Sequence, residues 1–165
     1  MKRKNINIEY WKARYELDPE GPTGLKWKSV TEGQYRQWGN KAGTPAGRIH
    51  PSKGYYRVRS GDEGDVFVHR LVWALYYNEQ PPEIIDHINR DKTDNRIENL
   101  RACTNLENTQ NWKGRGYCLD KRSGKYQAEI KVDGIRKWLG YFDNEAAAAN
   151  AYMQAKLELH PSFTP

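Results

Sequence analysis

Alternating hydrophobic and polar positions are clearest in the last third of the chain, where they predict a hairpin of two strands. Between Lys125 and Val132 every second residue is hydrophobic, so a pleated strand would turn these side chains to one face. A second run extends from Ile135 to Phe142, and Asp133-Gly134 separates the two. Asp-Gly between alternating runs is the strongest short-range hairpin signal. The side chains on the hydrophobic face of the first strand are Tyr126, Ala128, Ile130 and Val132.

A helix is predicted after this hairpin, from Asn144 to Leu159. Asp143 or Asn144 would cap its first turn, and Pro161 ends it. The helix has a thin face, able to lie close to a sheet, made of Ala147, Ala148, Ala151 and Ala155. With one more strand, which begins near Tyr117, the tail is expected to form a three-stranded antiparallel sheet packed on one helix.

The middle of the chain predicts a second small core. Tyr55–Arg59 and Val66–Val68 flank a glycine-containing turn and predict a hairpin, and His69–Tyr77 has hydrophobic residues at helical spacing. Glu83–Ile85 is a short β run. Thr104-Asn105-Leu106-Glu107 matches the capping box that starts a helix. The expected order after the first helix is strand, loop, strand, helix.

The beginning of the chain is less regular. Asp18–Pro22 is a strong turn signal, and Leu25–Lys28 predicts a short strand. The stretch 31–53 alternates glycine, proline and basic residues without a period, which predicts a loop. Met1–Tyr15 could be a short helix, an arm laid along DNA, or a frayed basic terminus. A polar stretch near residues 111–115 marks a boundary, so the expected parts are residues 1–53, 54–112 and 113–165.

Composition changes this picture in two ways. The mean hydropathy is −1.01, so 165 residues favour two small cores over one large one. Six tryptophans and eleven tyrosines partly offset the shortage of aliphatic residues. The net charge of +6 indicates an anionic partner, with nucleic acid the leading candidate.

The cysteines and the chain start limit the possible classes further. Cys103 and Cys118 are too few and too far apart for a zinc ribbon or a disulfide framework, so no structural zinc is expected. The basic start Met1–Lys4 is not followed by an apolar core. Because no apolar run reaches membrane-spanning length either, we expect a soluble cytoplasmic protein that is neither secreted nor membrane-bound.

The most informative polar stretch runs from Ile85 to Arg101, where Asp86-His87 precedes a run of Asn and Asp side chains. A histidine beside a carboxylate is a catalytic grouping more than a structural one. The alternative is an Asx-turn loop that carries a surface histidine. Of the other histidines, His69 is expected to pack or hydrogen-bond at a helix start, whereas His50 and His160 carry no pattern and are expected on the surface.

The spacing in this stretch resembles the HNH endonucleases, in particular the phage and intron homing-type members. Asn99 follows His87 by twelve positions (99 − 87 = 12) and Asn108 follows it by twenty-one (108 − 87 = 21). The similarity extends back through Val68–Trp73 and Gly54–Val58. The third residue of the HNH motif is often histidine, and in this chain that residue is Asn108. The resemblance implies a small ββα-metal nuclease domain, a DNA substrate, and Mg²⁺ or Mn²⁺.

The chemistry of phosphodiester cleavage gives each of these side chains a role. It needs an activated water, stabilisation of the charge growing on the phosphate, and an acid or metal for the leaving oxygen. His87 suits the first task as a general base. Asp86 and Asn108 supply the hard oxygen ligands that a divalent ion accepts. Asn99 would hold the loop so that His87 points at the phosphate.

One geometric condition follows. Neighbouring residues on a strand point to opposite faces, so Asp86 and His87 can both face a metal only where the strand ends or bends.

The tail resembles a second family. Ala128-Glu129-Ile130, Trp138-Leu139-Gly140 and Ala147-Ala148-x-x-Ala151-Tyr152 look like the DNA-binding domain of plant APETALA and ethylene-response factors, over Gly116 to about Pro161. The resemblance implies that exposed side chains of the sheet contact DNA, and the candidates are Arg122, Lys125, Glu129, Lys131, Arg136 and Trp138. The alternative is a small module that packs against a protein partner.

The resemblances together imply an α+β protein that cuts double-stranded DNA with a metal and selects its site with the tail. One active site per chain makes nicking by a monomer natural. The rival hypothesis is a non-enzymatic DNA-binding regulator with a relic nuclease domain. Asp86, His87 and Asn108 are all present, which favours the enzyme, because a relic should have lost at least one of them.

Overall fold

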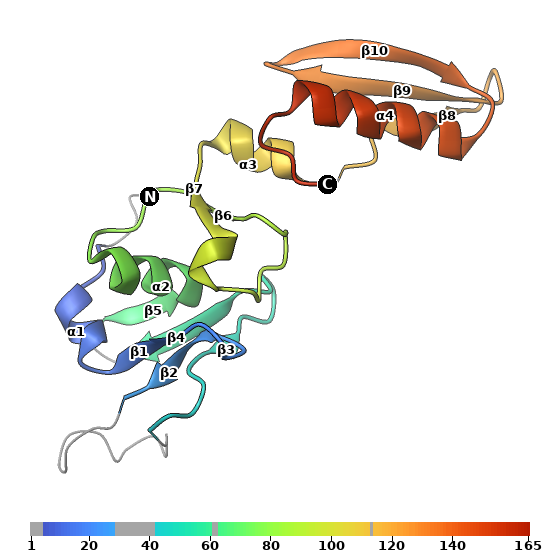
Figure 1. Ribbon diagram of the computed structural model, residues 1–165. Coiled ribbons are helices and arrows are strands. Elements are labelled where there is room, and N and C mark those ends of the chain that lie inside the picture. The colour runs from blue at the N-terminus through green and yellow to red at the C-terminus, as the bar shows by residue number, and fades with distance from the viewer. Residues whose placement is uncertain (1–4, 29–41, 61–62, 113) are drawn as a thin grey trace. The chain divides into compact units, whose positions relative to one another are not determined.

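The computed structural model describes residues 5–28, 42–60, 63–112 and 114–165, and the chain divides into two units, Met1–Cys103 and Thr104–Pro165 (Figure 1). Each unit has its own antiparallel sheets and helices. This mixture of helices and small antiparallel sheets agrees with the predicted α+β class, and the ββα-metal arrangement stays a prediction. Within the described ranges, no helix is both long enough and apolar enough to cross a membrane.

The first unit, where it is described, contains three small antiparallel sheets and three helical segments. The sheets are β1-β2, β3-β4-β5 and β6-β7. In chain order the elements are α1 (Ile8–Lys12), β1 (Tyr15–Asp18), β2 (Gly24–Trp27), β3 (Arg48–Ile49), β4 (Tyr56–Ser60), β5 (Gly64–Phe67), α2 (Val68–Tyr77), β6 (Ile85–His87), the 3-10 turn η2 (Ile97–Asn99) and β7 (Leu100–Ala102).

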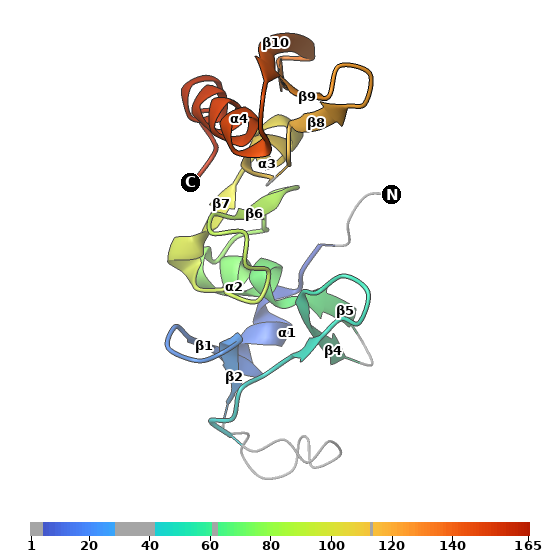
Figure 2. The same ribbon diagram turned by 90° about the vertical axis from the view of Figure 1, so that its right-hand side faces the viewer.

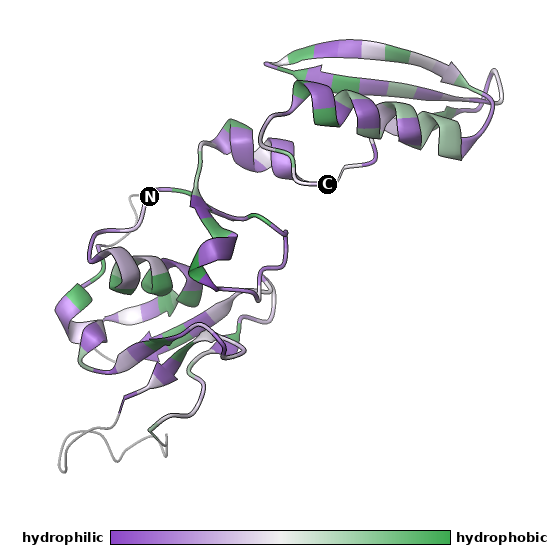
Figure 3. Cartoon of the chain, in the orientation of Figure 1, coloured by the Kyte–Doolittle hydropathy of each residue, from purple (hydrophilic) through white to green (hydrophobic). Residues whose placement is uncertain are grey.

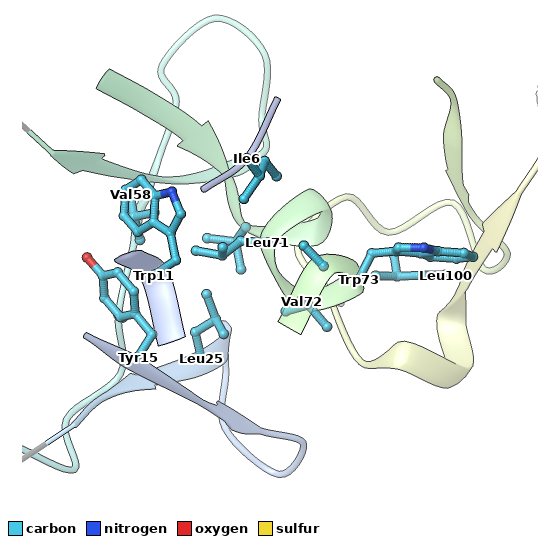
Figure 4. Packing of buried hydrophobic residues seen from close by; sticks show 12 residues of the cluster. Ile6, Trp11, Tyr15, Leu25, Val58, Leu71, Val72, Trp73 and Leu100 are labelled. Atoms are coloured by element: carbon cyan, nitrogen blue, oxygen red, sulfur yellow. The ribbon is translucent and has the colours of Figure 1, made fainter. Parts of the chain in front are cut away.

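Helix α2 is the centre of this unit. It contacts α1, β1 and β2 as well as β4, β5 and η2, and Figure 2 shows it between the N-terminal elements and β6-β7. Its own Leu71 is fully buried. Figure 4 shows Trp11 and Leu25 on one side of the helix, with Trp73 and Leu100 on the other. The core thus continues from the start of the chain to the strand that pairs with β6.

The described residues before position 54 contribute to this core, whereas the sequence suggested a separate basic, loop-rich segment. Trp11 is fully buried and stacks on Tyr15 with ring centroids 5.7 Å apart. Within the described part of the stretch 1–15, Ile8–Lys12 forms a short helix, α1, and a short helix was one of three alternatives. The β1-β2 pairing follows because the turn at 18–22 brings Leu17 opposite Leu25. Large aromatic side chains compensate here for the few aliphatic ones.

The second unit contains α3 (Asn105–Asn111), β8 (Tyr117–Asp120), β9 (Lys125–Val132), β10 (Ile135–Phe142) and α4 (Glu145–Leu159). The strands form one antiparallel sheet in the order β10-β9-β8, and α4 runs along one face of it. Asp133 and Gly134 both have positive φ, 50° and 85°, as a type I′ hairpin turn requires.

The alternation predicted for β9 is confirmed. Ala128 and Ile130 are buried, whereas Glu129 and Lys131 between and after them are exposed, and Figure 3 shows the alternation as bands along the strand. One histidine in this unit contradicts its prediction. His160 is buried, and its ring nitrogen Nε2 donates to the Lys131 carbonyl at 2.9 Å, so the expectation of a surface residue was wrong.

Helix α3 begins as the sequence predicts and belongs with the second unit. The Thr104 side chain accepts from the Glu107 backbone N–H, and the Glu107 carboxylate accepts from the Thr104 N–H, so the capping box is complete. At the other end, the Thr164 backbone N–H donates to the Asn111 side chain. The division between the units falls after residue 103, nine positions before the predicted boundary at 112/113.

Candidate active site

Strand β6 carries Asp86 and His87 to the point where the strand ends. It pairs with β7 so that Asp86 lies opposite Arg101 and His87 opposite Leu100. Immediately afterwards the Arg90 backbone N–H donates to the His87 carbonyl at 2.8 Å, and Arg90 itself has a φ of 66°. The strand therefore ends at His87. This meets the condition under which Asp86 and His87 can both face one metal ion.

Asp86 is held by the strand opposite. Its Oδ2 accepts from Arg101 Nε at 3.1 Å and Nη2 at 2.8 Å, and the carboxylate is largely buried. Hydrogen bonds from a guanidinium to a carboxylate are charge-assisted and directional. Arg101 thus fixes the orientation of the candidate metal ligand. Motif spacing did not single out Arg101, although its place directly across a two-stranded ladder is the signal that would have identified it.

His87 is buried, with only 4% of its surface exposed. Its ring lies 5.7 Å from the Tyr55 ring and 5.2 Å from the ring of His69, which meets it edge-on. His69 itself packs at the start of α2, as predicted. The loop after β6 does contain Asx turns, but the buried ring is incompatible with the alternative of a surface histidine on such a loop.

Burial lowers the pKa of His87 below its ordinary value of 6.5. A hydrogen bond with Asn95 and the negative charges of Asp86, Asp91 and Asp94 act in the opposite direction, and burial outweighs them. The ring is therefore neutral at neutral pH. A neutral imidazole is the protonation state that a general base needs.

Asn99 closes the loop between β6 and β7. Its Oδ1 accepts from the Asn89 backbone N–H at 2.9 Å, and its Nδ2 donates to the Asp94 carbonyl at 2.8 Å. The Asn89 side chain in turn donates to the Asp94 carboxylate at 2.9 Å. The amide of Asn99 thus makes the loop contacts that its predicted positioning role would use, and that role stays a prediction.

The candidate metal ligands come from both units. Asp86 lies on β6 of the first, and Asn108 lies on α3 of the second, so their joint coordination of an ion stays a prediction. In the described parts of the chain, no group of three or more His, Cys, Asp or Glu side chains is arranged to hold a metal. One carboxylate and one amide oxygen suit Mg²⁺, which keeps several waters and uses substrate phosphate oxygens as ligands.

The residues proposed for DNA contact, apart from Arg122, lie on the face of the second sheet that α4 does not cover. Arg136 pairs with Lys131 across β9 and β10, and Trp138 pairs with Glu129. Arg136 Nη1 also lies 3.0 Å from the Glu129 carboxylate. Lys125 lies at the start of β9 and Arg122 in the turn before it, both exposed. Their contact with DNA remains a prediction.

Tyr141 belongs to the same outer face and was missed from the sequence. It lies opposite Gln127, and its ring meets that of Trp138 edge-on at 4.9 Å. Both rings are about half exposed, at 53% and 54%. The register shift between Trp138 and Gly140 explains the omission, because it breaks the simple alternation from which faces are assigned along a strand.

Comparison with known proteins supports the resemblance over the middle of the chain, from β5 to helix α3. A family model described as "HNH endonuclease" matches residues 66–110, a range that contains Asp86, His87, Asn99 and Asn108. An uncharacterized HNH endonuclease of Acanthamoeba polyphaga mimivirus is 38% identical over 99 residues, 58% of this chain and 24% of that protein. The DNA endonuclease I-HmuI of Bacillus phage SP01 is 32% identical over 135 residues, 68% of this chain and 76% of that protein. No solved structure matches.

Proposed function

This chain belongs to the HNH endonuclease family, a family of nuclease enzymes, and on that basis we propose that it is a metal-dependent DNA endonuclease of the homing type. The observation that supports this proposal best is the pairing of a buried, neutral His87 with an arginine-held carboxylate, Asp86, at the end of one strand. The printed name of the phage relative, a DNA endonuclease, suggests the substrate.

In the proposed reaction, His87 accepts a proton from the water that attacks the scissile phosphorus. Asp86, kept in place by Arg101, and Asn108 would hold Mg²⁺ or Mn²⁺. Such an ion supplies positive charge for the phosphate and the leaving oxygen. Asn99 keeps the loop closed so that His87 is presented in one orientation. Each chain has one such set of residues, so a monomer would nick one strand.

The test that decides between this function and its rival is incubation of the purified protein with supercoiled plasmid and Mg²⁺, with and without EDTA. An endonuclease converts the plasmid to nicked or linear form only while the metal is available. A DNA-binding regulator with a relic nuclease domain retards the plasmid in a gel but leaves it intact.

Replacing Asp86 by alanine should raise the Mg²⁺ concentration needed for cleavage, and Asn108→Ala should do so to a smaller extent. A charged oxygen binds a hard cation more strongly than an amide oxygen does. The measurement is the nicking rate against Mg²⁺ concentration. Asp94→Ala is the matched control, because it removes a nearby loop carboxylate that pairs with Arg96. An unchanged metal dependence in the Asp86 and Asn108 variants would exclude both as ligands.

The cleavage rate should fall as the pH is lowered, with its midpoint at a pH below 6.5. The general base must be neutral, and burial lowers the pKa of His87 below 6.5, so protonation begins at a lower pH than for a free histidine. A cation at Asp86 would lower this pKa further. Single-turnover rates on both sides of this pH provide the measurement, and a midpoint above 6.5 would contradict the assignment.

We also propose that the outer face of the second sheet binds DNA and selects the site. Two observations support this proposal. The exposed cations Lys131 and Arg136 lie opposite each other on β9 and β10, and the rings of Trp138 and Tyr141 meet on the same face. Glu129 would suit a contact with cytosine, because a carboxylate accepts from the cytosine amino group. The competing proposal is a module that packs against a protein partner, and it predicts that removing this sheet leaves DNA binding unchanged.

A further inference from the structure

Asn95 is the most completely buried polar residue near the candidate base, with 2% of its surface exposed. It lies in the loop between β6 and η2. Its Oδ1 is 3.3 Å from His87 Nε2, while its Nδ2 donates to the Thr23 carbonyl at 3.2 Å and to the Thr93 carbonyl at 3.1 Å. One side chain thus joins the base, its own loop and the turn between β1 and β2.

These three contacts determine which way the amide faces. Only the NH₂ group of an asparagine can donate to two carbonyl oxygens, so the atom toward His87 is the oxygen. An oxygen acceptor requires a hydrogen on the nitrogen that meets it. In the neutral ring that hydrogen is on Nε2, and the basic lone pair is then on Nδ1.

We propose that Asn95 is a positioning residue that fixes the Nε2–H tautomer and the ring orientation of His87, and that the Thr23-Gly24 turn holds Asn95 in place. The catalytic consequence rests on the proposed nuclease function, whereas the tautomer itself does not. Outer hydrogen-bond partners of this kind typically change activity about 10- to 100-fold when they are removed. The proposal gives the N-terminal part of the chain a role at the active site.

The turn is built to support Asn95 closely. Gly24 has a φ of 78°, and a Cβ added there would lie 3.1 Å from the Asn95 carbonyl oxygen and 3.2 Å from its Cβ. Thr23 is buried, and its hydroxyl donates to the Leu25 carbonyl at 2.8 Å. Leu25 is fully buried in the core beside α2. The turn is therefore tied to the core, and it lies outside the range 66–110 that the family model covers.

The first test is a measurement on the wild-type protein. Long-range ¹H–¹⁵N NMR spectra of the full chain, recorded where the histidines are neutral, separate the two imidazole tautomers, and the four histidines are assigned by substitution. We expect the Nε2–H pattern for His87. An Nδ1–H pattern in the wild-type protein would overturn the proposal. The spectrum does not depend on cleavage, so a protein that fails to nick plasmid would disprove the nuclease function and leave this result standing.

Variants of Asn95 separate positioning from simple structural support. Asn95→Ala should lose the pure Nε2–H pattern and lower kcat roughly 10- to 100-fold with little change in KM for DNA. Asn95→Asp keeps an acceptor for Nε2–H and should retain the tautomer. Arg96→Ala, in the same loop, serves as the control, because the exposed Arg96 side chain pairs with Asp94 rather than with His87. If Asn95→Ala keeps the wild-type tautomer and kcat, the proposal fails.

A glycine pair tests the supporting turn without touching the loop. Gly24→Ala places a methyl group against Asn95, whereas Gly43→Ala, at a φ of 76°, has nothing within 4 Å. Both variants carry a similar backbone strain. We expect Gly24→Ala to lower kcat and perturb the His87 signals, and Gly43→Ala to leave both unchanged. Equal effects of the two variants on kcat would mean that the turn does not act through Asn95.

Discussion

His87→Ala is expected to reduce DNA cleavage by about 10²- to 10⁴-fold while leaving DNA binding nearly intact. A positioned general base contributes about this factor to the rate. The ring is nine-tenths or more buried, and it lies at the end of β6 beside the carboxylate proposed to hold the metal. The side chains proposed to bind DNA lie in the other unit, so affinity for DNA should depend little on this substitution.

The measurement is a single-turnover nicking rate, paired with a gel-shift titration and thermal unfolding of the same variant. His50→Ala provides the matched control, because the His50 ring also meets the aromatic cluster through Phe67, at 6.2 Å, but His50 follows β3 and is not part of β6. The His50→Ala variant should nick DNA at the wild-type rate. A His87→Ala protein that is folded and cuts at the wild-type rate would show that another group activates the water.

Local signals in the sequence predicted much of the fold, and they succeeded where structure depends on neighbours along the chain. The β9-β10 hairpin follows from two alternating runs and from Asp133-Gly134, which has the positive φ values of a type I′ turn. The start of α3 follows from the Thr104 capping box. At both places the backbone preferences and the side-chain hydrogen bonds of a few neighbouring residues favour the same structure. The hairpin and the helix start can therefore be predicted without knowledge of distant contacts.

Contacts between distant segments were not visible in the sequence. Trp11 and Tyr15 gave no periodic pattern, yet they pack against α2, some sixty positions later. Asn95 is one of several Asn and Asp residues in its loop, and only its contact with Thr23, 72 positions away, distinguishes it. His160 appeared isolated and is buried against Lys131. Such positions are determined by tertiary packing, which composition and spacing do not encode.

Removing the tail should reduce affinity and site preference while the catalytic group remains. A chain that ends after Asn111 keeps Asp86, His87, Asn99 and Asn108 but lacks the β8-β9-β10 sheet with its exposed cations. For every phosphate that the shortened chain no longer neutralises, the dependence of log affinity on log salt concentration should become flatter by about 0.9. Binding and nicking of target and scrambled DNA at two salt concentrations provide the measurement.

A pair of substitutions in the full-length chain tests the same point without truncation. Arg136 and Lys137 are adjacent cations on β10, but Arg136 lies opposite Lys131 on the outer face and Lys137 opposite Ile130, which is buried on the side of α4. If the outer face reads bases, Arg136→Ala should reduce discrimination between target and scrambled DNA by about 1–3 kcal/mol, or roughly 5- to 150-fold. Lys137→Ala should leave discrimination unchanged.

The pattern across these variants decides what the tail does, because groove contacts carry sequence information and phosphate contacts do not. If only Arg136→Ala loses discrimination between target and scrambled DNA, and the truncated chain has a flatter salt dependence, the tail recognises the DNA sequence. Equal small losses in Arg136→Ala and Lys137→Ala would indicate binding by charge only. A truncated chain that keeps both its salt dependence and its site preference would identify the tail as a protein-interaction module, and the first unit would then have to select the site.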